Sequence, residues 1–317
     1  MSSAGIPSVD LRDFLSNDDL RKKAFVKALG DAYENIGFVA IKGHFLNDEL
    51  SANLYKQVQA FFNLNETTKL KYEIEGLAGQ RGYTSFGKEH AKGSSAGDLK
   101  EFWHFGQYVE DDDPVKSEYP DNVSVKELPG FNAVGNETYQ NLEKTGKYML
   151  RAIAIHLGLE ETYFDNKIHN GNSILRPIHY PPITQAPKNA VRAGQHEDIN
   201  LITLLMGASA DGLQVLNKQG KWVSVTALPE QLVVNVGDML QRLTNGKLKS
   251  TTHRVVNPPR EKWGTSRFSI PFFLHPRSDM RLDCLESCID EQHPKQFDDC
   301  TAGEYLDERL REIGLKK

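Results

Sequence analysis

A series of short β-branched runs in the second half of the chain sets the strongest limit on the fold. From about residue 172 these runs recur at close spacing, and Gly, Asn, Asp and Pro residues separate them. The runs are residues 174–180, 199–205, 213–216, 221–225, 232–236, 251–256 and 267–274. Many short strands joined by turns are typical of a β-sandwich or a barrel of the jelly-roll kind. We therefore expect a jelly-roll core in this half.

The first half of the chain is predicted to be mainly helical, with occasional strands. Apolar residues recur there at the spacing of amphipathic helices in residues 16–35, 47–62 and 136–158. Residues 76–97 are rich in Gly and Ser with mixed charge, which predicts a long loop over a functional region. The tail returns to helix from Thr301, where Glu304 completes the pattern of a capping box.

These patterns indicate an α+β protein built on a jelly-roll, or double-stranded β-helix, core. We expect residues 1–171 to form a mainly helical N-terminal region, residues 172–280 to form the core, and residues 281–317 to form a C-terminal helical tail. No clean linker separates these regions in the sequence. The helical part is therefore expected to pack directly on the β core.

Composition narrows the functional classes. The 317 residues carry 38 Lys and Arg against 43 Asp and Glu, and 39% of them are hydrophobic. That apolar share can fill a core, whereas the net charge of −5 argues against general binding to nucleic acid or anionic membranes. No apolar run approaches the roughly 20 residues that span a bilayer, and the first eight residues lack a secretory pattern. Three cysteines do not suggest a disulfide framework. We expect a cytoplasmic protein, monomeric by default, that binds neither nucleic acid nor membrane.

His196, Asp198 and His253 form the candidate chemical centre. His196 and Asp198 stand two residues apart, so in a strand or its immediate extension their side chains share a face. A later strand lying beside the first brings His253 to the same place. Two imidazoles and one carboxylate leave three adjacent coordination positions open, which suits non-haem Fe(II) better than zinc. A His-x-Asp pair alone is more often an ordinary hydrogen-bonded pair, so this assignment depends on further elements.

Arg267 and Ser269 supply one such element. They are two residues apart on a predicted strand and therefore share a face. A buried guanidinium needs an anionic partner, and its planar fork matches a carboxylate. The Ser269 hydroxyl adds a donor, and Tyr180 at the end of another strand adds a phenol. This group is a candidate carboxylate site, although an isolated Arg on an edge strand usually faces solvent.

Further short motifs occur before, between and after these residues along most of the chain. They include Gly37-Phe38, Arg81-Gly82-Tyr83, Tyr180-Pro181-Pro182, His196-Glu197-Asp198, Gly212-Leu213-Gln214-Val215, Asn235-Val236-Gly237-Asp238 and Arg267-Phe268-Ser269. Together they resemble the Fe(II)- and 2-oxoglutarate-dependent oxygenases of the isopenicillin N synthase-like family. The resemblance is strongest between Leu175 and Pro276.

The resemblance implies a metal centre made by the two histidines and Asp198, and a clamp on 2-oxoglutarate made by Arg267, Ser269 and Tyr180. Many plant members have Asn two residues before the Tyr, where this chain has Ile178. The implied enzyme uses Fe(II), 2-oxoglutarate and O2 to oxidise a C–H bond of a small molecule, with release of succinate and CO2. Hydroxylation, desaturation and cyclisation are all open outcomes.

Two alternatives stay open at this point. The first is an Fe(II) oxidase like isopenicillin N synthase itself, which uses no 2-oxoglutarate and whose equivalent Arg-x-Ser pair binds a carboxylate of the peptide substrate. The second is a non-catalytic jelly-roll protein that binds a small carboxylate. The first would consume oxygen without producing succinate, and the second would consume no oxygen.

The substrate contacts are predicted from position along the chain. Basic residues here are candidates for anchoring a substrate carboxylate, and aromatic residues for an apolar wall, although both types more often serve as surface ion pairs or core. The candidates are Arg81, Phe102, His104, Arg176, His179, Arg192 and Gln241. The expected substrate is a small metabolite, an amino acid or a short peptide derivative.

Overall fold

A computed structural model describes residues 6–77, 79–89, 98–184, 191–207, 212–225, 228 and 230–312. The helices within these ranges are α1 (Leu11–Phe14), α2 (Asp19–Asn35), α3 (Asp48–Phe62), α4 (Glu66–Leu70), α5 (Pro129–His156), α6 (Asp165–Ile168), α7 (Asp238–Leu243) and α8 (Ala302–Glu312). The strands are β1 (Ser8–Asp10), β2 (Phe38–Lys42), β3 (Gly82–Thr84), β4 (Glu101–Gly106), β5 (Ile174–Leu175), β6 (Ile178–Tyr180), β7 (Ala193–His196), β8 (Ile202–Met206), β9 (Leu213–Leu216), β10 (Trp222–Ser224), β11 (Leu232–Val236), β12 (His253–Val255) and β13 (Arg267–Leu274).

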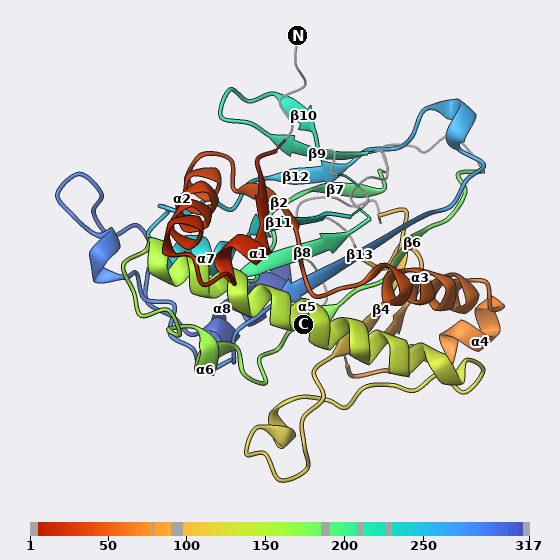
Figure 1. Ribbon diagram of the computed structural model, residues 1–317. Helices are drawn as coiled ribbons and strands as arrows, with labels where there is room; N and C mark the ends of the chain where they lie inside the picture. The colour runs from red at the N-terminus through yellow and green to blue at the C-terminus, as the bar shows by residue number, and fades with distance from the viewer. Residues whose placement is uncertain are drawn as a thin grey trace.

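The strands form two sheets that face each other (Figure 1). The major sheet has the order β1-β2-β11-β8-β13-β5-β4-β3, with β6 pairing β13 and β4. The minor sheet has the order β10-β9-β12-β7. Apart from the parallel pair β1 and β2, the paired strands are antiparallel. Two facing antiparallel sheets make the jelly roll that the spacing of the short strands predicts.

The major sheet is buried on both faces, and its strands sort their side chains by a period of two. In β13, Ile270, Phe272 and Leu274 belong to the main apolar core. The residues that alternate with them, Ser269, Pro271 and Phe273, line a cavity between the sheets. Because successive side chains of a strand point to opposite faces, one strand contributes to the core and the cavity at once. This explains why β13 reads as a nearly continuous apolar run.

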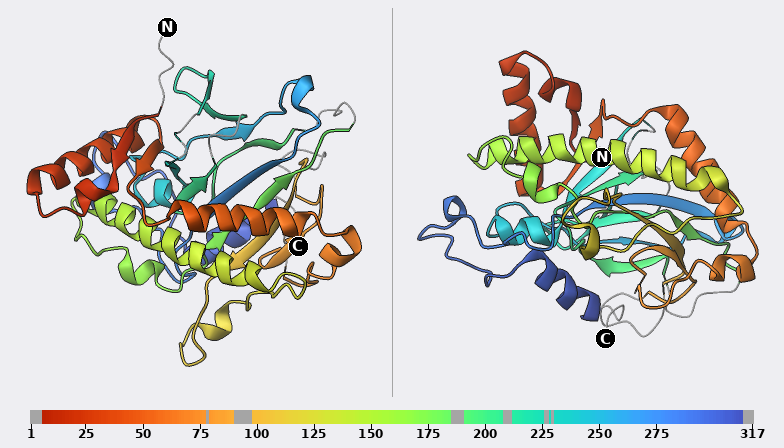
Figure 2. Two further views of the ribbon diagram at one scale, coloured as in Figure 1. Left: turned by 45° about the vertical axis from the view of Figure 1, so that its right-hand side comes forward. Right: turned by 90° about the horizontal axis from the view of Figure 1, so that it is seen from below.

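Helices α2, α3 and α5 cover the outer face of the major sheet, on the side opposite the minor sheet (Figures 1 and 2). Helix α3 begins after Asn47, whose side chain accepts a hydrogen bond from the Leu50 amide at 2.7 Å, and α5 begins at Pro129. An Asx N-cap and a Pro in the first turn both satisfy or remove amides that a helix start leaves unpaired. The apolar stripes of these helices bury the back of the sheet that carries the cavity.

The predicted elements are largely present, and some were not anticipated. The predicted helix at 136–158 begins earlier, at Pro129. The predicted loop at 76–97 contains β3, while residues 90–97 lie outside the described ranges. Strands β1 and β2 are the occasional strands expected in the N-terminal region, whereas β3 and β4 were not predicted, and all four join the major sheet. The division at residues 171/172 and 280/281 stays a prediction.

Three further features concern membrane-spanning helices, the cysteines and the start of α8. None of its described helices is both long enough and apolar enough to cross a membrane. Cys284, Cys288 and Cys300 are free thiols. The capping box predicted at the start of α8 is confirmed, because the Glu304 carboxylate accepts from the Thr301 amide at 2.8 Å and the Glu304 amide donates back to the Thr301 hydroxyl at 3.2 Å.

Candidate metal centre and active-site cavity

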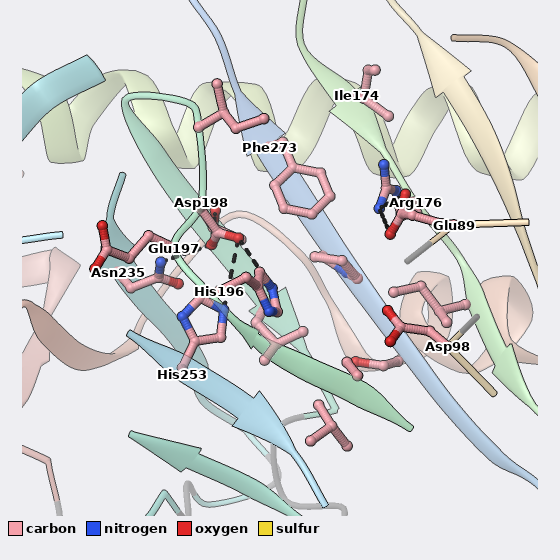
Figure 3. A pocket seen from close by; sticks show the side chains of 18 of the residues that line it. Glu89, Asp98, Ile174, Arg176, His196, Glu197, Asp198, Asn235, His253 and Phe273 are labelled. Atoms are coloured by element: carbon pink, nitrogen blue, oxygen red, sulfur yellow. Dashed lines mark hydrogen bonds and ion pairs between the residues drawn. The ribbon is translucent and has the colours of Figure 1, made fainter. Parts of the chain in front are cut away.

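Strand pairing brings the two predicted imidazoles together. His196 is the last residue of β7, His253 is the first residue of β12, and the two are directly opposite in the antiparallel register. Their ring centroids lie 4.4 Å apart. Asp198 follows β7 by two residues and returns its carboxylate to the same place, as Figure 3 shows. We call these three residues the triad.

Each histidine of the triad has the tautomer of its neutral ring set by the backbone. Nδ1 of His196 lies 2.8 Å from the carbonyl oxygen of Gly194, and Nδ1 of His253 lies 3.1 Å from that of Thr251. A carbonyl can only accept, so each Nδ1 donates and each Nε2 keeps its lone pair when the ring is neutral. The Nε2 atoms lie 3.8 Å and 3.7 Å from Asp198 Oδ1. This arrangement is typical of metal-bound histidines.

The Asp198 carboxylate is oriented in the same way. Its Oδ2 accepts hydrogen bonds from Thr203 Oγ1 at 2.7 Å and Asn235 Nδ2 at 2.8 Å, which leaves Oδ1 facing the imidazoles. Burial by itself raises the pKa of Asp198, but the two histidines and the two donors outweigh it, so the pKa lies below its ordinary value. The carboxylate is therefore ionised at neutral pH and offers one oxygen.

The triad fits a divalent metal ion. Metal–ligand bonds of about 2.1 Å let two ligand atoms of one ion lie up to about 4.2 Å apart. The two Nε2–Oδ1 distances are below that limit, and the three ligand atoms together lie within 4.8 Å of one another, a spread slightly wider than a bound ion requires. Within the described ranges, no other set of three His, Cys, Asp or Glu residues gathers in this way. Two nitrogens and one oxygen with three open positions suit Fe(II).

The triad stands at one wall of a cavity of about 360 Å³ between the sheets. Alternate residues of β13 and of the β5–β6 segment form the opposite wall. These residues are Ile174, Arg176, Ile178, Tyr180, Ser269, Pro271 and Phe273, and His275 follows them. Because side chains of a strand alternate between its two faces, every second residue of these strands lines the same wall of the cavity.

The predicted carboxylate clamp adjoins one end of this wall, where Tyr180 and Ser269 line the cavity and Arg267 lies beside the Tyr180 ring. Arg267 is directly opposite Tyr180 in the register of β13 and β6, and Ser269 is opposite Ile178. Arg267 is only 6% exposed, and its Nε and Nη1 have no hydrogen-bond partner in the described structure. A buried cation without a partner is costly, so these donors are arranged for an anion that the protein does not itself supply.

The other end carries charges that are already paired (Figure 3). Lys100 Nζ lies 2.6 Å from Glu89 Oε1 and 2.9 Å from Asp98 Oδ2. Arg176 Nη1 lies 3.2 Å from Glu89 Oε2, and Arg176 Nε donates to His104 Nε2. Burial and the Arg176 charge hold the pKa of His104 well below its ordinary value, so His104 is the neutral acceptor.

His275 is a cavity residue that the sequence reasoning missed. It continues the inward-facing series of β13, and its side chain lines the cavity although the residue is only 7% exposed. Burial lowers its pKa to about 4, so the ring is neutral at neutral pH. Its position two residues after Phe273 was the available signal, because the strand period places both on one face.

Several predicted substrate residues do not line the cavity. Arg81 is buried and donates to Gln107 Oε1 at 2.6 Å. His179 points to the opposite face of β6, where Nδ1 lies 2.7 Å from Glu101 Oε1. The centroid of the Phe102 ring lies 4.4 Å from the guanidinium carbon of Arg176. The side chain of Gln241 accepts a hydrogen bond from the Ser250 amide at 2.9 Å. Direct substrate contact by these four residues is therefore not supported, because core packing and internal hydrogen bonds already occupy them.

The remaining predicted residues are brought to the cavity or next to it. His104 and Arg176 line it, as do Tyr180, Ser269 and the triad. Arg192 is buried beside Tyr180, with its guanidinium carbon 5.7 Å from the ring centroid. Leu306, Arg309 and Leu310 of α8 complete the lining, so the C-terminal helix covers part of the cavity.

Comparison with known proteins agrees with this geometry. Residues 6–127 match the family described as non-haem dioxygenase in morphine synthesis N-terminal, and residues 171–276 match the 2OG-Fe(II) oxygenase superfamily. A 2-oxoglutarate-Fe(II) type oxidoreductase of Aspergillus fumigatus is 32% identical over 316 residues, which cover 96% of this chain and 92% of that protein.

Solved structures show the same relationship. A 2OG-Fe(II) oxygenase family protein from Caulobacter crescentus superposes with a TM-score of 0.88 at 42% identity, over 98% of this chain and 100% of that one. A full-length Neurospora crassa protein in complex with alpha-KG, which is 2-oxoglutarate, superposes with a TM-score of 0.86 at 29% identity, over 98% of each chain. Another structure of the Neurospora protein also holds thymine.

These relatives decide between the alternatives that the sequence left open. They are named for 2-oxoglutarate or bind it, which favours that co-substrate over an oxidase of the isopenicillin N synthase type and over a non-catalytic binding protein. The protein is a jelly-roll dioxygenase that uses Fe(II), 2-oxoglutarate and O2 to oxidise a small molecule. The chain belongs to the Fe(II)- and 2-oxoglutarate-dependent oxygenase superfamily.

Proposed function

We propose that the triad holds the iron and that 2-oxoglutarate extends from it to the clamp formed by Arg267, Ser269 and Tyr180. The observation that carries this assignment is that the protein hydrogen-bonds one polar atom of each triad side chain and leaves the other available to a metal ion. Nδ1 of each histidine and Oδ2 of Asp198 are occupied by the protein, while both Nε2 atoms and Oδ1 converge. When bound, iron with 2-oxoglutarate supplies the chemistry that oxidises a substrate C–H bond and releases succinate and CO2.

The substrate in this proposal is a small polar molecule with no net charge, such as a neutral heterocycle or a zwitterionic amino acid. The charge at the two ends of the cavity supports this. Two Arg267 nitrogens, Nε and Nη1, have no partner among the described residues, whereas Glu89, Asp98, Lys100 and Arg176 already balance one another. A substrate with a net charge would disturb a satisfied, buried set of ion pairs, which costs several kcal/mol by order of magnitude.

Arg176 and His275 are the proposed polar contacts of the substrate. Arg176 uses Nε and Nη1 for His104 and Glu89, so Nη2 is the donor that remains for a substrate oxygen or nitrogen. The neutral His275 ring offers a donor and an acceptor. Phe273 lies between them on the same wall and offers an apolar face. The thymine found in the related Neurospora protein is a neutral ligand of this kind.

The cellular setting is part of the proposal. Three free thiols support a cytoplasmic location, because reducing compartments keep cysteines unpaired.

Anaerobic titration of the Fe(II)-loaded protein with 2-oxoglutarate tests the assignment of the site. We expect the weak visible charge-transfer band that a 2-oxo acid gives when it chelates Fe(II), and its loss in Asp198→Ala together with loss of bound iron. Stoichiometric iron in that variant would refute the triad. Iron binding without the band in the unmodified protein would refute the 2-oxoglutarate site.

A succinate-release screen then tests the substrate class. Neutral heterocycles, thymine among them, and zwitterionic amino acids are compared with dicarboxylates and polyamines of similar size. We expect stimulation of succinate release only by compounds with no net charge. A strongly charged compound that gives the largest stimulation would contradict the argument from the balanced ion pairs.

A further inference from the structure

Arg192 is a second buried guanidinium at the clamp end of the cavity. It directly precedes β7, the strand that ends at His196, and it is only 4% exposed. Its guanidinium carbon lies 5.7 Å from the centroid of the Tyr180 ring, and that of Arg267 lies 5.0 Å from the same centroid. Two cations therefore gather around one phenol ring that lines the cavity.

The protein provides little to compensate this second charge. Arg192 Nη2 donates to the Thr265 carbonyl at 3.3 Å, and Arg192 Nε is buried without a partner in the described structure. No carboxylate among the described residues pairs with Arg192, in contrast to Lys100 and Arg176 nearby. Burial and the Arg267 charge both lower the pKa of Arg192, as expected for two neighbouring cations.

Around the Tyr180 ring, three buried guanidinium nitrogens therefore lack acceptors among the described residues: Nε and Nη1 of Arg267, and Nε of Arg192. Buried like charges and unpaired donors are each unfavourable, and one anion relieves both. A carboxylate has two oxygens with about four acceptor positions, enough for two guanidinium groups and a hydroxyl. The distal carboxylate of 2-oxoglutarate is the anion that the proposed function brings to this end.

We propose that Arg192 is a second cation for the distal carboxylate of 2-oxoglutarate and acts beside Arg267. This inference rests on the proposed position of the co-substrate. It assigns Arg192 to the co-substrate instead of to the substrate, which the sequence alone suggested. The aromatic ring of Tyr180 packs with both cations.

Two 2-oxo acids separate a charge effect from a structural one. 2-Oxopentanoate keeps the end that chelates iron but has a methyl group where 2-oxoglutarate has its distal carboxylate. Dissociation constants of both acids are measured anaerobically on the Fe(II)-loaded protein from the charge-transfer band, for the unmodified chain, Arg192→Met and Arg192→Lys. Arg81→Met is the matched control, because Arg81 is also buried with an unpartnered Nε but donates to Gln107 and has no contact with the Tyr180 ring among the described residues.

We expect Arg192→Met to weaken 2-oxoglutarate at least tenfold and to change 2-oxopentanoate by less than twofold. Arg192→Lys keeps the charge and should lose less, and Arg81→Met should leave both constants unchanged. Equal weakening of both acids in Arg192→Met would show a structural role and overturn the inference, as would unchanged 2-oxoglutarate affinity. Failure of the unmodified protein to bind 2-oxoglutarate would instead refute the proposed function. Iron content and Tm confirm that each variant is folded.

Discussion

Replacing Arg267 with Met should make the metal-free protein more stable and the co-substrate site weaker. The side chain is buried and leaves Nε and Nη1 without partners. Each unsatisfied buried donor costs about 1–3 kcal/mol, so the pair costs about 2–6 kcal/mol. Removing the guanidinium also loses its contact with the Tyr180 ring, worth about 0.5–2 kcal/mol. The net expectation is a gain of about 0–5.5 kcal/mol.

Thermal unfolding of the metal-free protein measures the first half of this prediction. At about 2 °C per kcal/mol for a chain of this size, the Tm of Arg267→Met should rise by up to about 11 °C. The affinity for 2-oxoglutarate should fall by about 2–5 kcal/mol, or roughly 30-fold to several thousandfold, since a charge-assisted pair is lost. Calorimetric or spectroscopic titration of the Fe(II)-loaded variant gives this value.

An exposed arginine provides the control. Arg281 pairs with Asp283 at 2.8 Å but its side chain is 56% exposed, so Arg281→Met should change stability by no more than about 0.5 kcal/mol and leave 2-oxoglutarate binding intact. A lower Tm in Arg267→Met would refute the reasoning, because it would mean that the guanidinium is satisfied within the folded chain. Affinity within threefold of the unmodified protein would remove Arg267 from the co-substrate site.

Three further outcomes are expected elsewhere in the molecule. Asn235→Ala removes one of two donors to Asp198, so metal affinity should fall about 10- to 100-fold in competition with a chromogenic chelator, and an unchanged value would place Asn235 outside the metal site. Burial raises the pKa of Glu143 to about 7, although the Lys147 charge opposes the shift. Ionising Glu143 therefore lowers the free energy of unfolding, by an amount that is absent near pH 4 and grows as the pH rises to 7. Glu143→Gln should therefore gain about 2 kcal/mol at pH 8 and nothing near pH 4 in thermal unfolding, and equal gains at both would contradict the burial argument. Thr301→Ala removes the N-cap of α8, which is worth about 1 kcal/mol, and should speed amide exchange in α8 but not in α5. Unchanged exchange in α8 would show that the contacts of α8 with the cavity, and not its cap, stabilise the helix.

Local patterns in the sequence were enough to predict most of the second half. Strands β9, β11 and β13 have the bounds that their β-branched runs predict, because turn residues interrupt the pattern at both ends. Strand β4 was missed, since Glu101–Gly106 is buried on both faces and shows no alternation to detect. Strand β7 was missed for a different reason: its sequence, Ala-Gly-Gln-His, has low strand propensity, and pairing with β12 holds it in place.

Residue types and their order along the chain are sufficient to indicate an iron centre and a carboxylate site in this protein. His196, Asp198 and His253, followed by Arg267 and Ser269, supply ligand types that suit iron and a carboxylate, because donor chemistry belongs to each residue wherever it lies. The period of two in the strands also assigns alternate residues to one wall of the cavity.

Which polar residues are free to act depends on packing in three dimensions. Arg81, Arg176 and Arg192 look alike in the sequence, yet one bonds to Gln107, one is balanced by Glu89, and one stands beside a second cation without an acid. The same holds for His179, which Glu101 occupies, and for His275, which faces the cavity. Partners of this kind come from strands far apart in the chain. A residue's availability depends on which groups packing brings within hydrogen-bond distance, and no local pattern contains that information.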